Sequence, residues 1–144
     1  MIKIRLLNPG VFATLSDDIK AANRRALAKT GDSVFDLLYA AADKHTKTGG
    51  MIRSLNQSFN GTAYTIEHNL QQAPHAAFVH WGARPHVIKP RNKKILRFPV
   101  GGAFVFARSV NHPGYKGDPY FVTIATPERV QSLFSAYLTA ELPK

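Results

Sequence analysis

The stretch from Ala76 to Phe121 constrains this chain more than any other part of its sequence. Prolines and glycines recur along it between short apolar runs. Proline fixes φ and removes a backbone donor, whereas glycine admits positive φ, so the backbone here must alternate between short strands and turns. A segment of this kind can form a catalytic pocket, a nucleic-acid surface or a contact between subunits. These three possibilities make different demands on its residues.

The length of 144 residues predicts a single domain, residues 1–144, that is large enough to bury a core. The chain has no cysteine, which excludes disulfides, thiol catalysis and cysteine-based zinc sites. No apolar run approaches the length needed to span a bilayer, and the N-terminus lacks the profile of a signal peptide. We therefore expect synthesis in a reducing cytoplasm and no membrane association.

The charge balance is the strongest global feature. The chain has 19 basic and 9 acidic residues, a formal net charge of +10. Such a surplus raises the affinity for nucleic acid or for acidic partner surfaces. A solvated basic face that keeps the protein soluble is the alternative interpretation.

The N-terminal half predicts a strand and a long helix. Residues 1–7 alternate apolar and basic side chains, and Asn8–Gly10 has the residues of a turn. Ser16 suits a helix N-cap, and apolar residues then recur at helical spacing to about Lys44, with Gly31 inside the pattern. We expect one long helix that tolerates this glycine.

The second half predicts short strands and a final helix. Met51–Leu55 suits a helical turn or an edge strand, and residues 59–68 suit a strand with a tight turn at Asn60–Gly61. Residues 76–81 predict a central strand, and two short strands, 95–99 and 103–106, meet at Gly101–Gly102. Residues 119–144 predict a helix with Thr126 capping Pro127. The resulting fold class is α+β: a mostly antiparallel sheet of four to six short strands, packed by a long N-terminal helix and a C-terminal helix.

Histidines suggest chemistry, but their spacing does not support it. His75, His80, His86 and His112 lack the spacing of a zinc site, and carboxylates are scarce nearby. His86, His112 and Lys116 are residue types of a general acid–base site, without supporting spacing. We assign no catalytic residue, metal or cofactor and expect no enzymatic activity. A small hydrolase stays as an alternative, which predicts that His86→Ala or His112→Ala abolishes activity with the fold intact.

A basic run supplies a nucleic-acid candidate. Its cations alternate with Trp81, Phe98 and Phe104, so phosphate contacts and base stacking are both available. We expect these aromatic side chains to fill the core instead. The cations of the run are Lys89, Arg91, Lys93, Lys94 and Arg97.

Several segments in order resemble the neck and tail-completion proteins of long-tailed bacteriophages, which join the DNA-filled head to the tail. The long glycine-containing helix is followed by Thr48–Leu55, which resembles the family's Thr-Gly-X-Leu-X-X-Ser segment. Ala76–Pro90 is similar to its strand and turn leading to Pro-His-X-Ile-X-Pro. His80 stands where a glutamate is usual, and Tyr120 separates the family's Pro-Phe pair. The remaining matching segments are Lys94–Pro99, Val110–Gly114 and Asp118–Phe121.

The resemblance implies a structural virion protein that forms a ring, sixfold or twelvefold, at the head–tail junction. Its partners would be further copies of itself, neighbouring head-completion and tail proteins, and packaged DNA through non-specific contacts. A basic nucleic-acid-binding module without a virion role is the alternative. In the loops that we expect to contact subunits or partners, the candidate residues are Arg84, His86, Lys89, Arg91, Lys93, Lys94, Arg97, His112, Tyr115 and Lys116.

Overall fold

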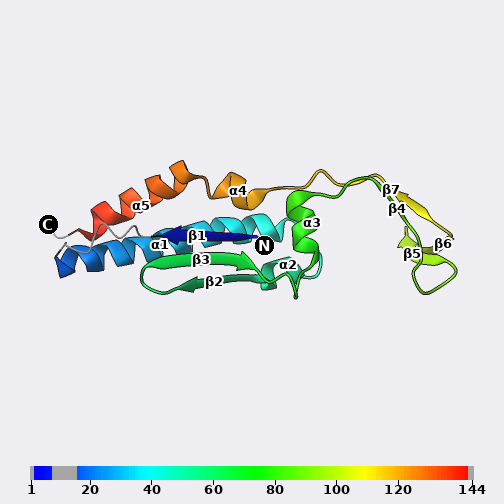
Figure 1. Ribbon diagram of the computed structural model, residues 1–144, viewed down its shortest axis with the longest axis horizontal. Coiled ribbons are helices and arrows are strands. Elements are labelled where there is room, and N and C mark those ends of the chain that lie inside the picture. The colour runs from blue at the N-terminus through cyan, green and yellow to red at the C-terminus, as the bar shows by residue number, and fades with distance from the viewer. Residues whose placement is uncertain (1, 8–15, 143–144) are drawn as a thin grey trace.

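The structure is a computed structural model that describes residues 2–7 and 16–142. Within these residues it contains five helices and seven strands, and every strand pair is antiparallel (Figure 1). The predicted α+β class is therefore confirmed. The turn predicted at Asn8–Gly10 lies outside the described residues.

One long helix organises the body of the molecule. Helix α1, Asp17–Asp43, buries one face at helical spacing, which confirms the prediction of an unbroken helix. Ser16 is the N-cap residue, but its side chain makes no capping hydrogen bond. Asp17 and Asp18 instead place negative charge in the first turn, where the helix dipole favours it.

A three-stranded sheet packs on α1. Its strands are β1 (Lys3–Leu7), β2 (Leu55–Phe59) and β3 (Ala63–His68), in the order β1-β3-β2. The predicted turn between β2 and β3 is confirmed: the Asn60 side-chain oxygen accepts hydrogen bonds from the backbone N–H groups of Thr62 and Ala63, at 3.0 and 2.8 Å. The Tyr64 ring of β3 lies directly on the backbone of α1 at Gly31, where an added Cβ would come within 2.1 Å of the ring.

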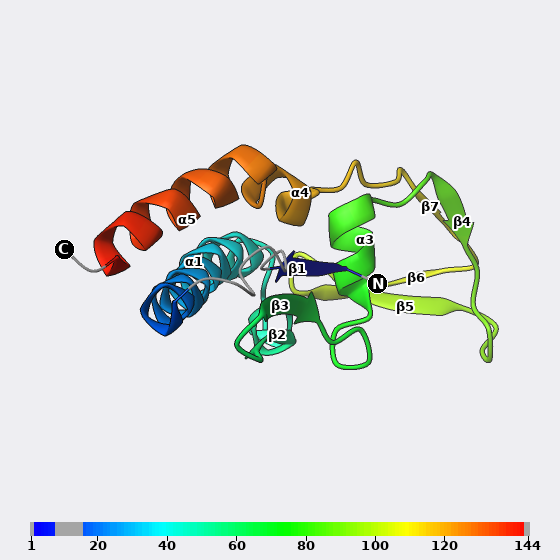
Figure 2. The ribbon, with the colours of Figure 1, turned by 60° about the vertical axis from the view of Figure 1, so that its left-hand side comes forward.

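The C-terminal region forms two helices, α4 (Tyr120–Ile124) and α5 (Pro127–Glu141), so the prediction of one helix from residue 119 was wrong. Proline disfavours helical backbone in the residue before it, and Thr126 is extended, with ψ of 148°. Thr126 does cap α5, as predicted. Helix α5 runs antiparallel to α1: the Ser33 and Tyr137 hydroxyl oxygens are 2.7 Å apart, and Glu141 pairs with Arg25 and Lys29 (Figures 1 and 2).

The strand predicted at residues 76–81 is also wrong, because His75–Trp81 forms helix α3. A short apolar run fits a buried strand or a helix equally well by periodicity. Here Ala76 and His80, four residues apart, are buried on one face, whereas Phe78 and Trp81 are exposed. The segment at Met51 is the helical turn α2, Gly50–Arg53, which was one of the two structures predicted for it.

The other four strands do not join the body's sheet. Strands β4 (His86–Ile88) and β7 (Val110–His112) pair, and so do β5 (Leu96–Val100) and β6 (Ala103–Ala107), which meet at Gly101–Gly102 as predicted. Together they form an arm that leaves the body after α3 and returns at α4 (Figures 1 and 2). The described strands thus form three small sheets in place of the single sheet expected. No helix in residues 2–7 and 16–142 has the length and hydrophobicity that a membrane span requires.

A cluster of rings lies where the arm joins the body. His68 on β3 is buried, its Nδ1 lies 2.8 Å from the Ser54 hydroxyl, and its Nε2 lies 2.5 Å from the Tyr120 hydroxyl. Burial, together with the charges of His80 and His75, lowers the pKa of His68 from 6.5 to about 4. Burial also lowers the pKa of His80, against an opposing effect of Asp118. Both imidazoles are therefore neutral in the folded protein near neutral pH.

Replacing Gly31 with alanine should destabilise the protein even though alanine is the better helix former. Alanine gains about 1 kcal/mol of helix propensity over glycine. Its Cβ would overlap the Tyr64 ring, and overpacking of this kind costs about 1–3 kcal/mol. Urea unfolding of Gly31→Ala, alone and in a Tyr64→Ala background, checks this. We expect a loss of stability alone and a gain in that background; a gain in both would contradict the packing account.

The free energy of unfolding should fall between pH 6.5 and pH 4. In this range the unfolded chain binds a proton on His68 and the folded protein does not, so protons favour unfolding, by up to about 3 kcal/mol for this residue. His68→Gln should flatten the pH dependence measured by urea unfolding. If the free energy of unfolding changed equally with pH in the wild type and in His68→Gln, His68 would not be the source of the pH dependence.

Candidate functional site: an exposed basic arm

The two chains of the arm are held together tightly where they leave the body. We call residues 83–117 the basic arm. At its root, Ala83 and Tyr115 exchange two backbone hydrogen bonds of 2.8 Å, and the N–H of Asp118 donates to the Val79 carbonyl at 2.8 Å. The Asp118 carboxylate also lies 2.9 Å from His45 Nε2, just after the end of α1. The root is therefore attached both to α3 and to the end of the long helix.

Glycine is required at the root because the two backbones almost touch. Gly82 has φ of 82° and ψ of −177°, a conformation that is essentially confined to glycine. A Cβ on Gly82 would lie 2.4 Å from the Tyr115 carbonyl oxygen, and one on Gly117 would lie 2.5 Å from the Gly82 nitrogen. The close approach fixes the direction in which the arm leaves the body.

The arm has no core of its own. No residue from Trp81 to Pro119 is buried, although His80 and Tyr120 on either side are each 2% exposed. Large apolar side chains of the arm face solvent instead, among them Phe104 (56% exposed) and Phe106 (59%), as does Trp81 (64%) just before the arm begins. Two-stranded hairpins are marginal in water by themselves, and exposed apolar patches of this kind mark interaction sites.

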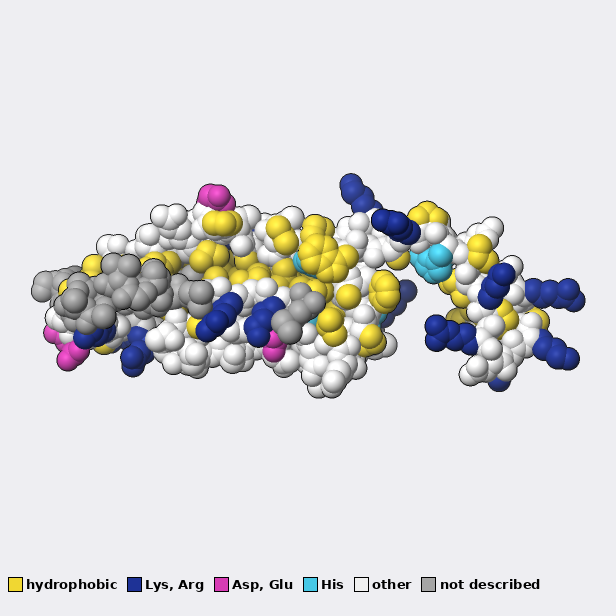
Figure 3. Space-filling view, in the orientation of Figure 1, with side chains coloured by type: hydrophobic (Ala, Val, Ile, Leu, Met, Phe, Trp, Pro, Cys, Tyr) yellow, Lys and Arg dark blue, Asp and Glu magenta, His cyan; other side chains and the backbone are white. Residues whose placement is uncertain are grey.

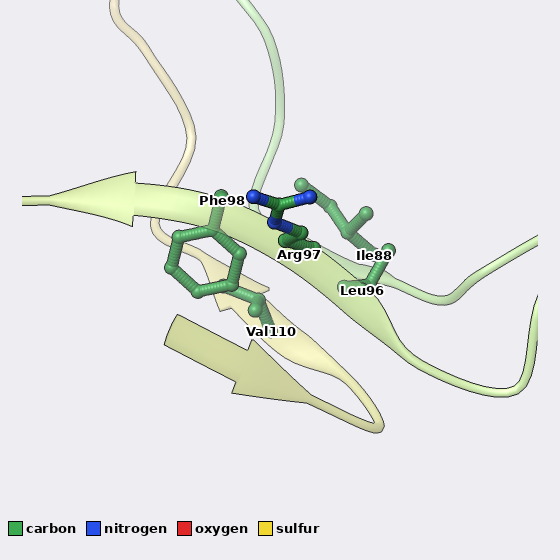
Figure 4. Close-up of a pocket in the computed structure, with 5 residues that line it drawn as sticks. All are labelled: Ile88, Leu96, Arg97, Phe98 and Val110. Atoms are coloured by element: carbon green, nitrogen blue, oxygen red, sulfur yellow. The ribbon is translucent and has the colours of Figure 1, made fainter. Parts of the chain in front are cut away.

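An apolar hollow of about 320 Å³ lies between the two small sheets of the arm (Figure 4). Arg97 is the one charged residue that lines it. The Arg97 guanidinium carbon lies 3.7 Å from the centroid of the Phe104 ring, a cation–π arrangement that holds its charge over the hairpin. The residues lining the hollow are Ile88, Leu96, Arg97, Phe98 and Val110.

The arm also contains most of the net charge of the protein. Residues 83–117 include eight Lys and Arg and no Asp or Glu, a charge of +8. The remainder of the chain has 11 basic and 9 acidic residues, a charge of +2. Figure 3 shows basic side chains projecting from the arm in several directions, with acidic side chains only over the body on that face. The arm is therefore both apolar and strongly cationic.

The structure brings all ten candidate contact residues onto the arm. Arg84 precedes β4, the segment that links β4 to β5 has four of the cations, and Arg97 lies on β5. His86 and His112 are register partners with stacked rings whose centroids are 5.0 Å apart. The remaining two candidates, Tyr115 and Lys116, lie on the return strand near the root, and the four cations of the link are Lys89, Arg91, Lys93 and Lys94.

Hydrogen bonds orient the two histidines of the arm. His86 Nδ1 donates to the Arg84 carbonyl at 2.8 Å, and His112 Nδ1 accepts from the Gly114 N–H at 3.0 Å. Neither ring contacts a carboxylate, and the described residues include no group of three or more His, Asp or Glu side chains arranged to hold a metal ion. The two histidines are therefore arranged as neighbours across the paired strands β4 and β7.

Sequence reasoning misplaced the aromatic side chains. Trp81, Phe98 and Phe104 were expected to fill the core. Phe104 on the arm and Trp81 at the end of α3 are mostly exposed, and Phe98 is only partly buried, at the hollow of the arm. One signal could have indicated this: the arm's short strands lie between prolines and glycines, with no helix of their own to pack on.

Comparison of the chain with protein-family models, curated proteins and solved structures finds no significant match.

Gly82→Ala should loosen the root of the arm. The substitution places a side chain in a glycine conformation and against the Tyr115 carbonyl, at a cost of about 1–3 kcal/mol. Hydrogen exchange at the Ala83 and Tyr115 amides should accelerate. Gly101→Ala, at the hairpin tip where nothing lies within 4 Å of the added Cβ, is the control and should leave these two amides unaffected. Unchanged exchange in Gly82→Ala would mean that the root is not held by this contact.

Proposed function

We propose that this chain is a structural virion protein that forms an oligomeric ring at the head–tail junction of a long-tailed bacteriophage. In this role it links the head connector to the tail and surrounds the passage for DNA. The single observation that carries the proposal is the arm without a buried residue between Trp81 and Pro119. A protein that acts alone gains nothing from exposing these aromatic side chains, whereas an assembly buries them at its contacts.

The resembling segments support the same interpretation. Lys94–Pro99 and Val110–Gly114 fall on β5 and β7 of the arm, Ala76–Pro90 runs from α3 into β4, and Asp118–Phe121 forms the return to the body. They therefore belong to the part of the chain that needs a partner. A projecting arm gives a heterologous contact, in which one surface meets a different surface on the next copy, and such contacts close into rings when the rotation permits.

The proposed partners follow from the charge. Further copies of this chain and the neighbouring head-completion and tail proteins would cover the apolar side chains. The cations of the arm that stay outside those contacts would attract acidic protein surfaces or the phosphates of DNA in the channel, without reading its sequence. The place of action would be the virion, after synthesis in the host cytoplasm.

The charge also favours a second candidate, a basic nucleic-acid-binding module without a virion role. A cationic β-ribbon with exposed Phe104 and Phe106 offers phosphate contacts and stacking surfaces. This candidate predicts binding by a monomer or dimer. If six or more phosphates are contacted, affinity should fall by about 10³–10⁵ between 50 and 200 mM salt.

The native mass of the purified protein across a concentration series separates the two candidates. We expect the wild type to form a discrete oligomer that electron microscopy shows as a ring with an open centre. Phe104→Ser/Phe106→Ser should raise the concentration at half assembly by about tenfold or more, because buried aromatic side chains dominate interface energies. The control is Phe78→Ser, at an equally exposed position on α3, and it should assemble as the wild type does.

Two results would contradict the proposal. One is a wild type that stays monomeric at every concentration and binds DNA with the steep salt dependence above. The other is a double variant that assembles like the wild type, which would place the contact away from the arm.

A further inference from the structure

We infer that the basic arm of one copy docks on an acidic stripe along the outer face of α1 in the next copy. This inference rests on the proposed function and adds the receiving surface, which the resemblance does not supply. The acidic stripe consists of Asp32, Asp36, Tyr39 and Asp43, which recur at i, i+4, i+7 and i+11 and so share one face of the helix. All four are exposed.

The stripe faces away from the protein's own core. The buried residues of α1 in this half, among them Val34, Leu38 and Ala41, lie on the opposite side of the helix. Between Lys29 and Lys44 the sequence has three acidic residues and no basic one. In a chain of net charge +10, this is a local surface of opposite sign.

The carboxylates of the stripe lack cation partners in the described part of the chain. The ion pairs there use Glu67, Asp17, Glu141 and Asp118, and none uses an acid of the stripe. Asp32 accepts a hydrogen bond of 2.6 Å from the Tyr64 hydroxyl. Asp43 lies in the last turn of α1, where the helix dipole disfavours negative charge. Helix stability therefore does not explain an acid at this position.

The arm and the stripe are complementary in charge, chemistry and size. The arm offers eight cations without an acid, and the stripe offers three acids without a base. Exposed Phe104 and Phe106 on the arm match Tyr39 (42% exposed) on the stripe. The stripe extends for about 16 Å along the helix, and a five-residue strand such as β5 extends for about the same distance.

A second copy fits the stripe better than nucleic acid does. Phosphates would be repelled by Asp36 and Asp43, whereas the arm supplies the cations that those carboxylates lack. The contact is heterologous, since arm and stripe are different surfaces, and each copy has one of each. Every copy in a ring can therefore use its arm on one neighbour and its stripe on the other.

Charge reversal of each surface tests the pairing. Lys93→Glu/Lys94→Glu reverses exposed charges of the arm, and Asp36→Lys/Asp43→Lys reverses those of the stripe. Each variant alone should raise the concentration at half assembly by about tenfold or more at 0.1 M salt, because like charges then face each other. The control for the stripe variant is Asp18→Lys/Glu128→Lys, which changes the net charge by the same amount at exposed positions off the stripe and should assemble like the wild type.

Mixing the two variants provides the decisive measurement. In an equimolar mixture each reversed arm can meet a reversed stripe, and each wild-type arm can meet a wild-type stripe. The two variants should therefore assemble in alternation, and the concentration at half assembly should return to near the wild-type value. Native mass spectrometry should then show oligomers that contain both variants in equal number.

The outcomes separate this inference from the proposed function. If the stripe variant assembles like the wild type, or if the mixture stays dissociated, the receiving surface is wrong, although a ring built through the arm survives. If the arm variant loses only DNA binding and still assembles, the cations serve nucleic acid and the docking inference fails. A wild type that never assembles overturns both proposals.

Discussion

The contact between His80 and Tyr120 is the constraint on which the rest of the structure depends. These two buried rings have centroids 5.6 Å apart. His80 lies in the last turn of α3, Tyr120 begins α4, and the whole arm lies between them in sequence. Tyr120 also forms a hydrogen bond with His68 on β3, so the three-stranded sheet is attached to the base of the arm as well. The cost of closing a loop grows only slowly with its length. The body can therefore support a long exposed excursion without loss of its own core.

These two positions are also the two departures in the resemblance on which our proposal draws, with histidine where a glutamate is usual and tyrosine inside the Pro-Phe pair. The structure places the departures against each other, edge to face, with interplanar angle 77°. A carboxylate at position 80 would be buried in contact with the rings of Tyr120 and Phe121. A neutral imidazole fits this environment at a much smaller desolvation cost.

Much of the body could be predicted from the sequence because its signals are local and repeated. The helix of Asp17–Asp43 shows an apolar stripe over seven turns, and the β2–β3 turn shows Asn-Gly. Residues 76–81 were misassigned because a six-residue apolar run has no decisive period, and its conformation is set by the burial of His80. The sequence predicts that the helix merely tolerates Gly31, but the Tyr64 ring lies on its backbone and makes glycine necessary there. A local pattern does not reveal this contact, because the two residues are 33 positions apart.

The sequence predicted which residues belong to the candidate site, but not that they lie on an arm that projects from the body. The ten residues do lie on one arm, yet alternating patterns usually indicate one covered face, and here no residue on either face of the arm's strands is fully buried. Apolar side chains promote association, whereas a charge of +8 keeps like arms apart by repulsion. In the assembly that we propose, an arm with both properties would be repelled by the arms of other copies and attracted to a surface that is apolar and acidic. The proposed contact therefore joins two unlike surfaces, as a ring requires.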